Sequence, residues 1–374
     1  MPAPLSATER QNLFRACDRF LIGHGPRRIS TELAELAAAA DPAQPSDSYG
    51  TGGALEELER DVAALLGKPA ALFLPSGTMA QQIALRIHAD RARCTTVAFH
   101  PTCHLELHEQ RGYARLHGLH ACLVGRRDRL LTRADLETVA EPLAALLLEL
   151  PQREIGGLLP SWEELCEQAS WARQRGAALH LDGARLWESV PHYGRTLVEV
   201  CGLFDSVYVS FYKTLGGIAG AALLGSESFI AEAKLWQRRH GGNLVALYPY
   251  VLSAREGLKQ RLARIPGYVA LARRIAEQFA RLPGVRVVPD PPVTNLFHVH
   301  WPVEAQRLMD ASLVIARERK VALLSRTRPC DVAGHCITEI TIGDAASAIP
   351  LTELDACLAE LFHLATEPAR PSHT

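Results

Sequence analysis

The segment Val207–Gly217 reads VYVSFYKTLGG and places a lysine shortly after an apolar stretch. Residues Ser206–Ser210 are short, apolar at the centre and rich in valine, which predicts a buried strand. Lys213 then stands just past the carboxyl end of that strand. Loss of water there favours the neutral, nucleophilic amine, which can form a Schiff base with an aldehyde. Taken alone, an ordinary lysine in a strand-to-loop turn is the simpler interpretation.

A second polar segment, HLDGAR at His180–Arg185, overlaps and follows the predicted strand Ala178–Leu181. A carboxylate at such a strand end can hold a protonated pyridine nitrogen and make the ring a better electron sink. The alternative is that Asp182 caps the next helix and that Arg185 is a surface residue.

A third polar segment, Ser76-Gly77-Thr78, follows the predicted strand Ala70–Leu74 and opens a helix. Free backbone N–H groups and the positive end of the helix dipole make such a turn a phosphate site. The glycine lets the backbone approach closely, and the two hydroxyls can donate hydrogen bonds. Plain capping of the helix is the alternative.

Strands alternate with helices through this part of the chain, which predicts a mostly parallel sheet covered on both faces. Further strands are predicted at Thr95–Phe99, Leu119–Val124, Ala145–Leu150 and Ala219–Gly225. Ligands collect at the carboxyl ends of parallel strands, so we expect the three polar segments to meet.

The pattern predicts a large domain at 46–254 and a smaller α+β domain at 255–366. The smaller domain would open with a long helix at Leu258–Leu282, followed by strands near Val285–Val288 and Leu296–His300. Residues 1–45 would form a helix and a connector, and residues 367–374 a disordered tail. The first helix is predicted to begin at Ser6, paired with Glu9 in a capping box. Its apolar face would comprise Leu13, Phe14, Cys17, Phe20 and Leu21.

Composition excludes several classes of function. The net charge is −1, from 40 basic and 41 acidic residues, which argues against nucleic acid or an anionic membrane as a partner. The nine cysteines are scattered without a CxxC, so neither a disulfide framework nor a metal site is expected. Neither a signal peptide nor a membrane span is predicted, and we expect a cytoplasmic protein.

From about Asp47 to Gly225 the chain resembles the threonine aldolase / β-eliminating lyase group of pyridoxal-5′-phosphate (PLP) enzymes. The strongest match is His180–Arg185, together with the phosphate turn Leu74–Ala80. The resemblance implies the aspartate-aminotransferase-like fold of fold type I, with PLP as cofactor. It also implies a homodimer or homotetramer acting on a small-molecule amino acid.

The resemblance assigns roles to individual residues. Asp182 would pair with the pyridine nitrogen, Arg185 would lie near the substrate carboxylate and the cofactor's ring oxygen, and Lys213 would hold the cofactor. The residues implied to bind the cofactor are Ser76, Gly77, Thr78, His104, Asp182, Arg185, Ser210 and Lys213.

A histidine stacks on the cofactor ring in this family. The spacing to Glu109 and Gly112 fits His104 best, and His100 and His108 are alternatives. Tyr49 matches the family's tyrosine-glycine loop, and it would contact substrate.

The chain departs from the family where substrate binds. The family's N-terminal Arg-Ser-Asp-Thr motif is missing, and Pro26–Ser30 is the nearest stretch. The family's Glu-Asn-Thr-His segment reads ELPQR at Glu149–Arg153, so Gln152 stands where a histidine faces the β-hydroxyl. Glutamine can form hydrogen bonds but cannot act as a base near neutral pH. The family's late arginine is replaced near Thr338-Glu339, where Arg326 or Arg328 could compensate.

These departures predict a lyase that cleaves a β-hydroxy-α-amino acid other than threonine to glycine and an aldehyde. Lys213, His104 and Asp182 would be catalytic, with His104 or a water that it holds as the base. Arg185, Gln152 and Tyr49 would contact substrate. The alternatives are β-elimination, racemisation or transamination by the same cofactor, and, less favoured, a PLP-fold protein without catalysis.

Overall fold

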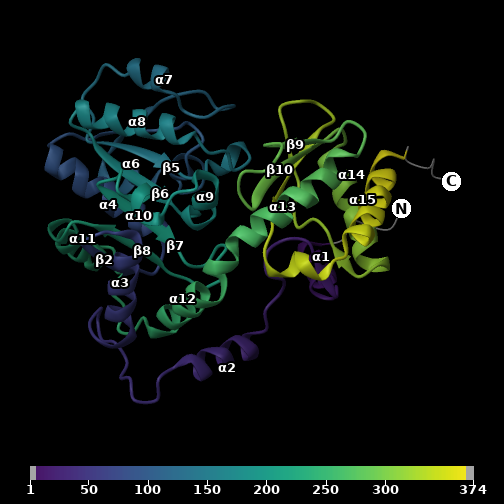
Figure 1. Ribbon diagram of the computed structural model, residues 1–374, viewed down its shortest axis with the longest axis horizontal. Coiled ribbons are helices and arrows are strands. Elements are labelled where there is room, and N and C mark those ends of the chain that lie inside the picture. Colours follow the sequence, from purple (N-terminus) through teal and green to yellow (C-terminus); the bar gives the residue numbers. More distant parts are fainter. Residues whose placement is uncertain (1–5, 368–374) are drawn as a thin grey trace. The chain divides into compact units, whose positions relative to one another are not determined.

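The computed structural model describes residues 6–367, which form two compact units (Figure 1). The larger unit comprises residues 29–265, and the smaller one residues 6–28 together with 266–367. The predicted domain bounds, 46–254 and 255–366, remain a prediction. Apart from Glu367, the predicted tail at 367–374 lies outside the described residues.

A seven-stranded sheet in the order β2-β8-β7-β6-β5-β3-β4 forms the centre of the larger unit. Strands β3 to β7 pair in parallel, whereas β8 runs antiparallel to both of its neighbours. The predicted, mostly parallel sheet is therefore confirmed. The strands are β2 (Ala70–Leu74), β3 (Thr96–Phe99), β4 (His120–Leu123), β5 (Ala145–Glu149), β6 (Ala178–Gly183), β7 (Ser206–Ser210) and β8 (Ala221–Gly225).

Both faces of this sheet are covered. Every residue of β7 and β8 is buried, which is typical of strands packed on two sides. Helix α4 packs across β3 and β5 to β8, and α11 packs against α4 and β2. The helical segments of this unit are α2 (Ile29–Ala39), α3 (Gly53–Leu66), α4 (Gly77–Ala92), α5 (His104–Leu107), α6 (Gly112–His117), α7 (Arg133–Glu137), η1 (Arg153–Ile155), α8 (Trp162–Gln174), α9 (Leu186–Tyr193), α10 (Leu197–Cys201), α11 (Glu227–Arg239), α12 (Tyr248–Arg261) and η2 (Leu262–Arg264).

Strand register brings chemical groups to one edge of the sheet. Glu149 at the end of β5 pairs with Asp182 on β6, and Asp182 pairs with Tyr208 on β7. Because the three strands are parallel, the loops that follow them leave from the same edge.

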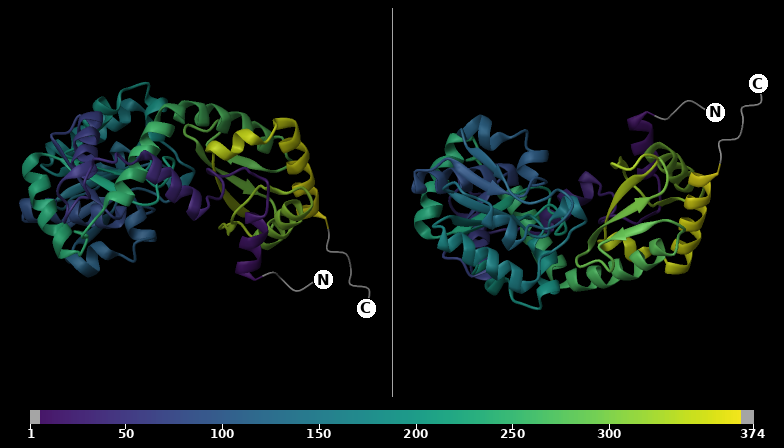
Figure 2. Two further views of the ribbon diagram at one scale, coloured as in Figure 1. Left: turned by 90° about the horizontal axis from the view of Figure 1, so that it is seen from below. Right: turned by 90° about the horizontal axis from the view of Figure 1, so that it is seen from above.

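The smaller unit contains an antiparallel sheet in the order β12-β13-β10-β9. Figure 2 shows α15, in yellow, lying beside these strands. Phe279 and Trp301 meet edge to face in the core, with ring centroids 5.7 Å apart. The elements are β1 (Arg19–Phe20), β9 (Arg286–Val288), β10 (Leu296–Trp301), β11 (Val321–Ala322), β12 (Arg328–Pro329), β13 (Cys336–Thr341), α1 (Ala7–Arg15), α13 (Ile265–Ala280), α14 (Ala305–Glu318), η3 (Asp344–Ala348) and α15 (Leu351–Thr366).

The first helix begins as predicted but ends early. Ser6 caps α1 and forms the capping box with Glu9. The helix ends at Arg15 rather than near Leu21, because Arg19–Phe20 forms strand β1 and pairs in parallel with β11. Phe20 still packs into the predicted apolar cluster, against Cys17 and residues of the smaller unit.

The predicted helix at Leu258–Leu282 is also wrong as a single element. It divides into α12 and α13, with the 3₁₀ turn η2 between them. Pro266 lies in the first turn of α13, where its missing N–H costs nothing; inside a continuous helix it would remove a hydrogen bond.

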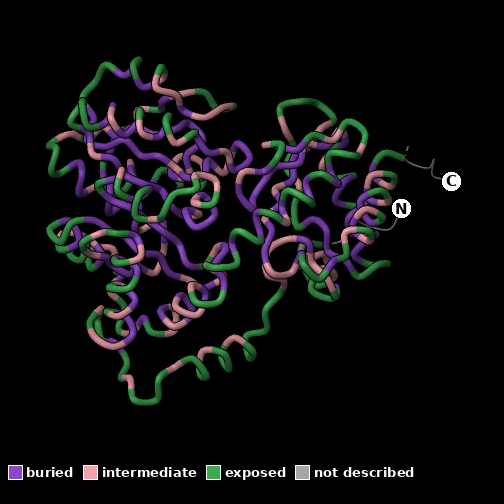
Figure 3. The backbone as a smooth tube through the Cα atoms, in the orientation of Figure 1, coloured by how far each residue is buried: buried purple, intermediate pink, exposed green. Residues whose placement is uncertain are grey.

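Helix α2 was not predicted from the sequence, and the structure explains why its pattern is weak. It has no buried residue, and Ile29 and Leu33 on it are exposed (Figure 3). Its apolar residues therefore do not define a core-facing stripe.

We expect the sheet core to tolerate truncation poorly. Leu223→Ala on β8 removes a fully buried side chain and should cost about 2–5 kcal/mol of unfolding free energy. Leu235→Ala on α11, where the leucine is exposed, should cost no more than about 0.5 kcal/mol. Urea unfolding of both variants measures the difference, and equal midpoints would contradict this packing.

Candidate active site

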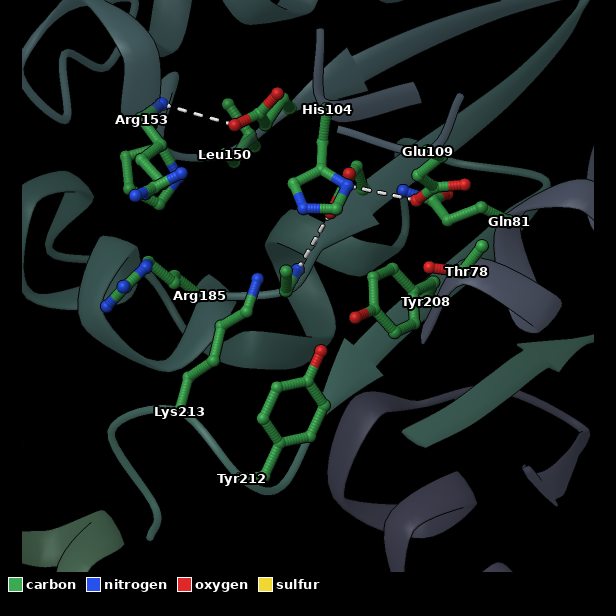
Figure 4. A pocket seen from close by; sticks show the side chains of 14 residues that line it. Thr78, Gln81, His104, Glu109, Leu150, Arg153, Arg185, Tyr208, Tyr212 and Lys213 are labelled. Atoms are coloured by element: carbon green, nitrogen blue, oxygen red, sulfur yellow. Dashed lines mark hydrogen bonds and ion pairs between the residues drawn. The ribbon is translucent and has the colours of Figure 1, made fainter. Parts of the chain in front are cut away.

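A pocket of about 430 Å³ lies at the edge of the sheet where β5, β6 and β7 end (Figure 4). It brings together parts of all three polar segments and the predicted histidine. The lining residues are Thr78, Gln81, His104, Glu109, Glu149, Leu150, Pro151, Arg153, Asp182, Ala184, Arg185, Tyr208, Tyr212 and Lys213.

Lys213 reaches the pocket from the loop after β7 (Figure 4). Burial lowers the pKa of its amine and the charge of Arg185 lowers it further, while Asp182 and Glu149 oppose the shift. The net effect favours the neutral, nucleophilic form. Tyr212, directly before the lysine, is partly exposed and lines the same pocket.

Asp182 is the penultimate residue of β6 and is almost fully buried. Its Oδ1 accepts a hydrogen bond from the backbone N–H of Ala184 at 3.1 Å. Burial raises the pKa of this carboxyl, and the positive charges of Lys213 and His104 oppose that shift. The two cationic groups near Asp182 therefore favour its ionised form over its protonated form.

His104 is held by a carboxylate. Its Nδ1 lies 2.9 Å from Glu109 Oε1, and this glutamate is 2% exposed at its side chain. Burial alone would lower the pKa of His104; the hydrogen bond to Glu109 and the charge of Asp182 outweigh it, so the pKa is raised.

The two alternative histidines do not line the pocket, although the ring of His108 lies 5.1 Å from that of His104, centroid to centroid. His100 contacts the backbone carbonyls of Arg126 and Arg129 and the hydroxyl of Thr102. His108 pairs with Glu154 at 2.9 Å and is more exposed. Neither lines the pocket, so the spacing argument that singled out His104 agrees with the geometry.

Arg185 and the loop that carries Lys213 share one anchor. Glu188, 1% exposed at its side chain, lies 3.7 Å from the Arg185 guanidinium. The hydroxyl of Thr214, the residue after Lys213, donates a hydrogen bond to the same carboxylate oxygen. Thr214 thus ties this loop to the arginine through Glu188.

The phosphate turn forms the start of α4. Ser76 caps the helix, accepting a hydrogen bond from the Met79 N–H at 3.2 Å. A Cβ at Gly77 would lie 1.9 Å from the hydroxyl of Tyr208, so only glycine fits. Thr78 is exposed to the pocket beside Tyr208 (Figure 4).

Five predicted residues do not line the pocket: Ser76 and Gly77 in the helix start described above, and Ser210, Gln152 and Tyr49. Ser210 is buried and donates a hydrogen bond to the Ala184 carbonyl at 2.8 Å. Gln152 donates to Thr102 Oγ1 at 3.2 Å, and its amide lies 3.5 Å from Glu149. Tyr49 is 60% exposed, in the left-handed region with φ of 47°. Their roles stay predictions.

Sequence reasoning assigned no role to several polar groups that line the pocket, among them Glu149 and Gln81. Burial and the charge of Asp182 raise the pKa of Glu149 to about 8. The available signal was its place at the end of a predicted strand, the criterion that found Asp182. Gln81 lies one helical turn after Thr78, so it faces the same side of α4.

The described part of the chain contains neither a helix that could span a membrane nor a group of metal ligands. No helix between residues 6 and 367 has the length and apolar character to cross a bilayer. Within that span, no three His, Cys, Asp or Glu side chains are grouped so as to hold a metal ion.

Comparison with known proteins gives consistent matches. Residues 30–301 match the family described as beta-eliminating lyase. The low specificity L-threonine aldolase of Escherichia coli (strain K12) is 30% identical over 68% of this chain and 75% of that protein. Aldolase vrtJ of Penicillium aethiopicum is 35% identical over 56% of this chain, which spans about half of that protein, 55%.

A solved structure from Listeria monocytogenes EGD-E, described as a candidate L-allo-threonine aldolase, superposes with a TM-score of 0.91. It is 43% identical and covers 95% of this chain and 98% of its own.

The residues of the pocket fit PLP. They offer a primary amine of lowered pKa, a buried carboxylate, and a helix start whose glycine has no room for a Cβ. The fold and this site define a PLP-dependent enzyme of fold type I. The chain belongs to the β-eliminating lyase family, which includes the threonine aldolases, and it is a PLP-dependent lyase.

The raised pKa of Glu149 makes stability depend on pH. The folded state keeps the proton up to about pH 8, whereas an unfolded glutamate loses it near pH 4.3. The folded state thus binds more protons between these values, so this group lowers the unfolding free energy as pH rises through them.

We expect Glu149→Gln to become more stable relative to the parent protein as pH rises from 5 to 9. Urea unfolding of both cofactor-free proteins at pH 5, 7 and 9 measures this difference. A difference that stays constant across the three values would show that Glu149 titrates normally.

Proposed function

We propose that this enzyme cleaves a β-hydroxy-α-amino acid to glycine and an aldehyde. The observation that carries the proposal is the pairing of His104 with Glu109 in the pocket that also holds Lys213. Aldol cleavage needs a base for the β-hydroxyl proton as well as an electron sink. The names of the threonine aldolase relatives support the same reaction.

Residues of this chain would hold the cofactor at three places. The backbone and hydroxyls at Ser76–Thr78 would hold the phosphate, Asp182 the pyridine nitrogen, and Lys213 the aldehyde carbon. Bound PLP supplies an electron sink that weakens bonds at the α-carbon of the amino acid.

The remaining groups would act on the substrate. Arg185 would bind the carboxylate and so orient the bond to be broken, because its guanidinium matches a carboxylate in a forked geometry. The neutral ring of His104 would take the β-hydroxyl proton, while Glu109 fixes the ring and stabilises its charged form. Gln152 and Tyr49 remain proposed substrate contacts that a bound ligand would test.

Assembly and location belong to the same proposal. The resemblance to the family supports a homodimer or homotetramer. A near-neutral net charge and nine cysteines without disulfide spacing support a cytoplasmic protein whose partner is a small amino acid.

Product analysis tests the reaction. With threonine, allo-threonine and phenylserine in turn, we expect glycine and the matching aldehyde in equal amounts from at least one of them. Lys213→Ala should abolish turnover because the cofactor loses its covalent anchor and the amino acid its exchange partner. A keto acid with ammonia, and no glycine from any β-hydroxy amino acid, would instead indicate β-elimination.

The base is tested with a matched pair of histidine variants. His104→Asn should lower kcat by about 10²–10⁴-fold, the usual contribution of a general base. His120→Asn should leave kcat nearly unchanged, since His120 is exposed on β4 and does not line the pocket.

The pH profile gives an independent reading of the same base. Because the pKa of His104 is raised, its basic form predominates only at a higher pH than in a free histidine, and kcat/KM should rise with pH through that range. The rise should be missing in His104→Asn. Equal loss of activity in both histidine variants would rule out this assignment.

A further inference from the structure

Behind the pocket lies a chain of buried polar side chains that the reaction described above does not use. Ser206 Oγ lies 2.7 Å from both His88 Nε2 and His180 Nδ1. His180 Nε2 in turn lies 2.7 Å from Gln81 Oε1. All four residues are at most 5% exposed.

This series of hydrogen-bonded side chains reaches the active site at Gln81. Gln81 lines the pocket, one turn along α4 from Thr78. Its Nε2 is buried and has no hydrogen-bond partner among the described residues. A buried amide nitrogen without a partner costs about 1–3 kcal/mol, which makes a donor facing a binding pocket a candidate ligand contact.

Both imidazoles in the chain are neutral near pH 7. Burial lowers the pKa of His88 to about 4, and burial together with the neighbouring His88 holds the pKa of His180 well below its usual range. A neutral imidazole has one donor and one acceptor nitrogen, so the tautomer of His180 fixes the direction of its bonds to Ser206 and to Gln81.

Two directions are possible, and the pocket decides between them. In one, His180 donates to Gln81 Oε1 and the amide N–H faces the pocket; in the other, the amide is reversed and its oxygen faces the pocket. Asp182 and Glu109 line the pocket, and their negative charges favour a donor over a carbonyl oxygen. The first direction agrees with the observed contact of Oε1 with His180.

We propose that Gln81 is a cofactor-binding residue: its amide N–H donates a hydrogen bond to bound PLP, and His180, Ser206 and His88 hold the amide in that orientation. Strand geometry supports the link, because His180 and Asp182 are two residues apart on β6 and point to the same face. Helix α4 packs against β6 on its path across the sheet. The inference rests on the PLP site alone and is independent of which amino acid is cleaved.

The test is a titration of cofactor-free protein with PLP, without any amino acid, followed by absorbance and tryptophan fluorescence. Gln81→Met should raise the Kd for PLP roughly threefold to tenfold, the value of one net hydrogen bond. Gln168→Met is the matched control, since it removes another buried glutamine, which bonds the Leu131 carbonyl outside the pocket. Its Kd should equal that of the parent protein.

The orienting role of His180 is tested by a double-mutant cycle. His180→Phe alone should weaken PLP binding, but it should add nothing in the Gln81→Met background because it acts through that amide. Ser206→Ala removes the hydroxyl that bonds His88 and His180. This variant is used in place of His180→Phe if circular dichroism shows that His180→Phe does not fold.

The outcomes separate the possibilities. An unchanged Kd in Gln81→Met would overturn the proposal, and additive effects of the two substitutions would remove the orienting role of His180. Gln81→Glu places a fourth carboxyl in the pocket, so PLP binding as tight as in the parent protein would likewise contradict a donor at this position. A parent protein that fails to take up PLP would count against the site as a whole.

Discussion

The reactivity of this site depends on the removal of water from the amine of Lys213. Burial disfavours its ammonium form, and the guanidinium of Arg185 adds a like charge, so the neutral amine becomes accessible. Asp182 and Glu149 limit the shift from the other side. A basic group poised between opposing charges in this way is typical of catalytic positions.

The sheet fixes where these charges lie. Glu149, Asp182 and Tyr208 are level with one another across β5, β6 and β7, so their separation follows from backbone pairing. The loops are then fastened to this frame: Ser210 bonds the carbonyl of Ala184, and Thr214 bonds Glu188. A site built on paired strands keeps its geometry better than one built on free loops.

Patterns local in sequence predicted much of this arrangement. The strand ends located Lys213 and Asp182, and capping pairs located helix starts such as Ser6. Features that depend on residues distant in sequence were not predicted. Phe20 became part of a strand only because Val321–Ala322 lies beside it, and Gln81 looked like any helical glutamine until His180 was placed next to it. A resemblance to a family recovers residues that its motifs share, which is how His104 was found. Glu149 stands in the matched segment Glu149–Arg153, but its place in the pocket followed only from the fold.

The departure at Gln152 gains a physical meaning from its contacts. The amide of Gln152 contacts Thr102 and Glu149 and does not line the pocket. In this chain, residue 152 therefore contacts the carboxyl group of Glu149, which does line the pocket. The backbone N–H of Arg153 also bonds Glu149 and favours its charged form, against the stronger effect of burial. The segment Glu149–Arg153 thus contributes one hydrogen bond that favours the charged form of a group in the pocket. Glutamine at position 152 cannot carry a proton, so the protonable side chains available to the reaction are those that line the pocket with Lys213, among them His104 and Glu149.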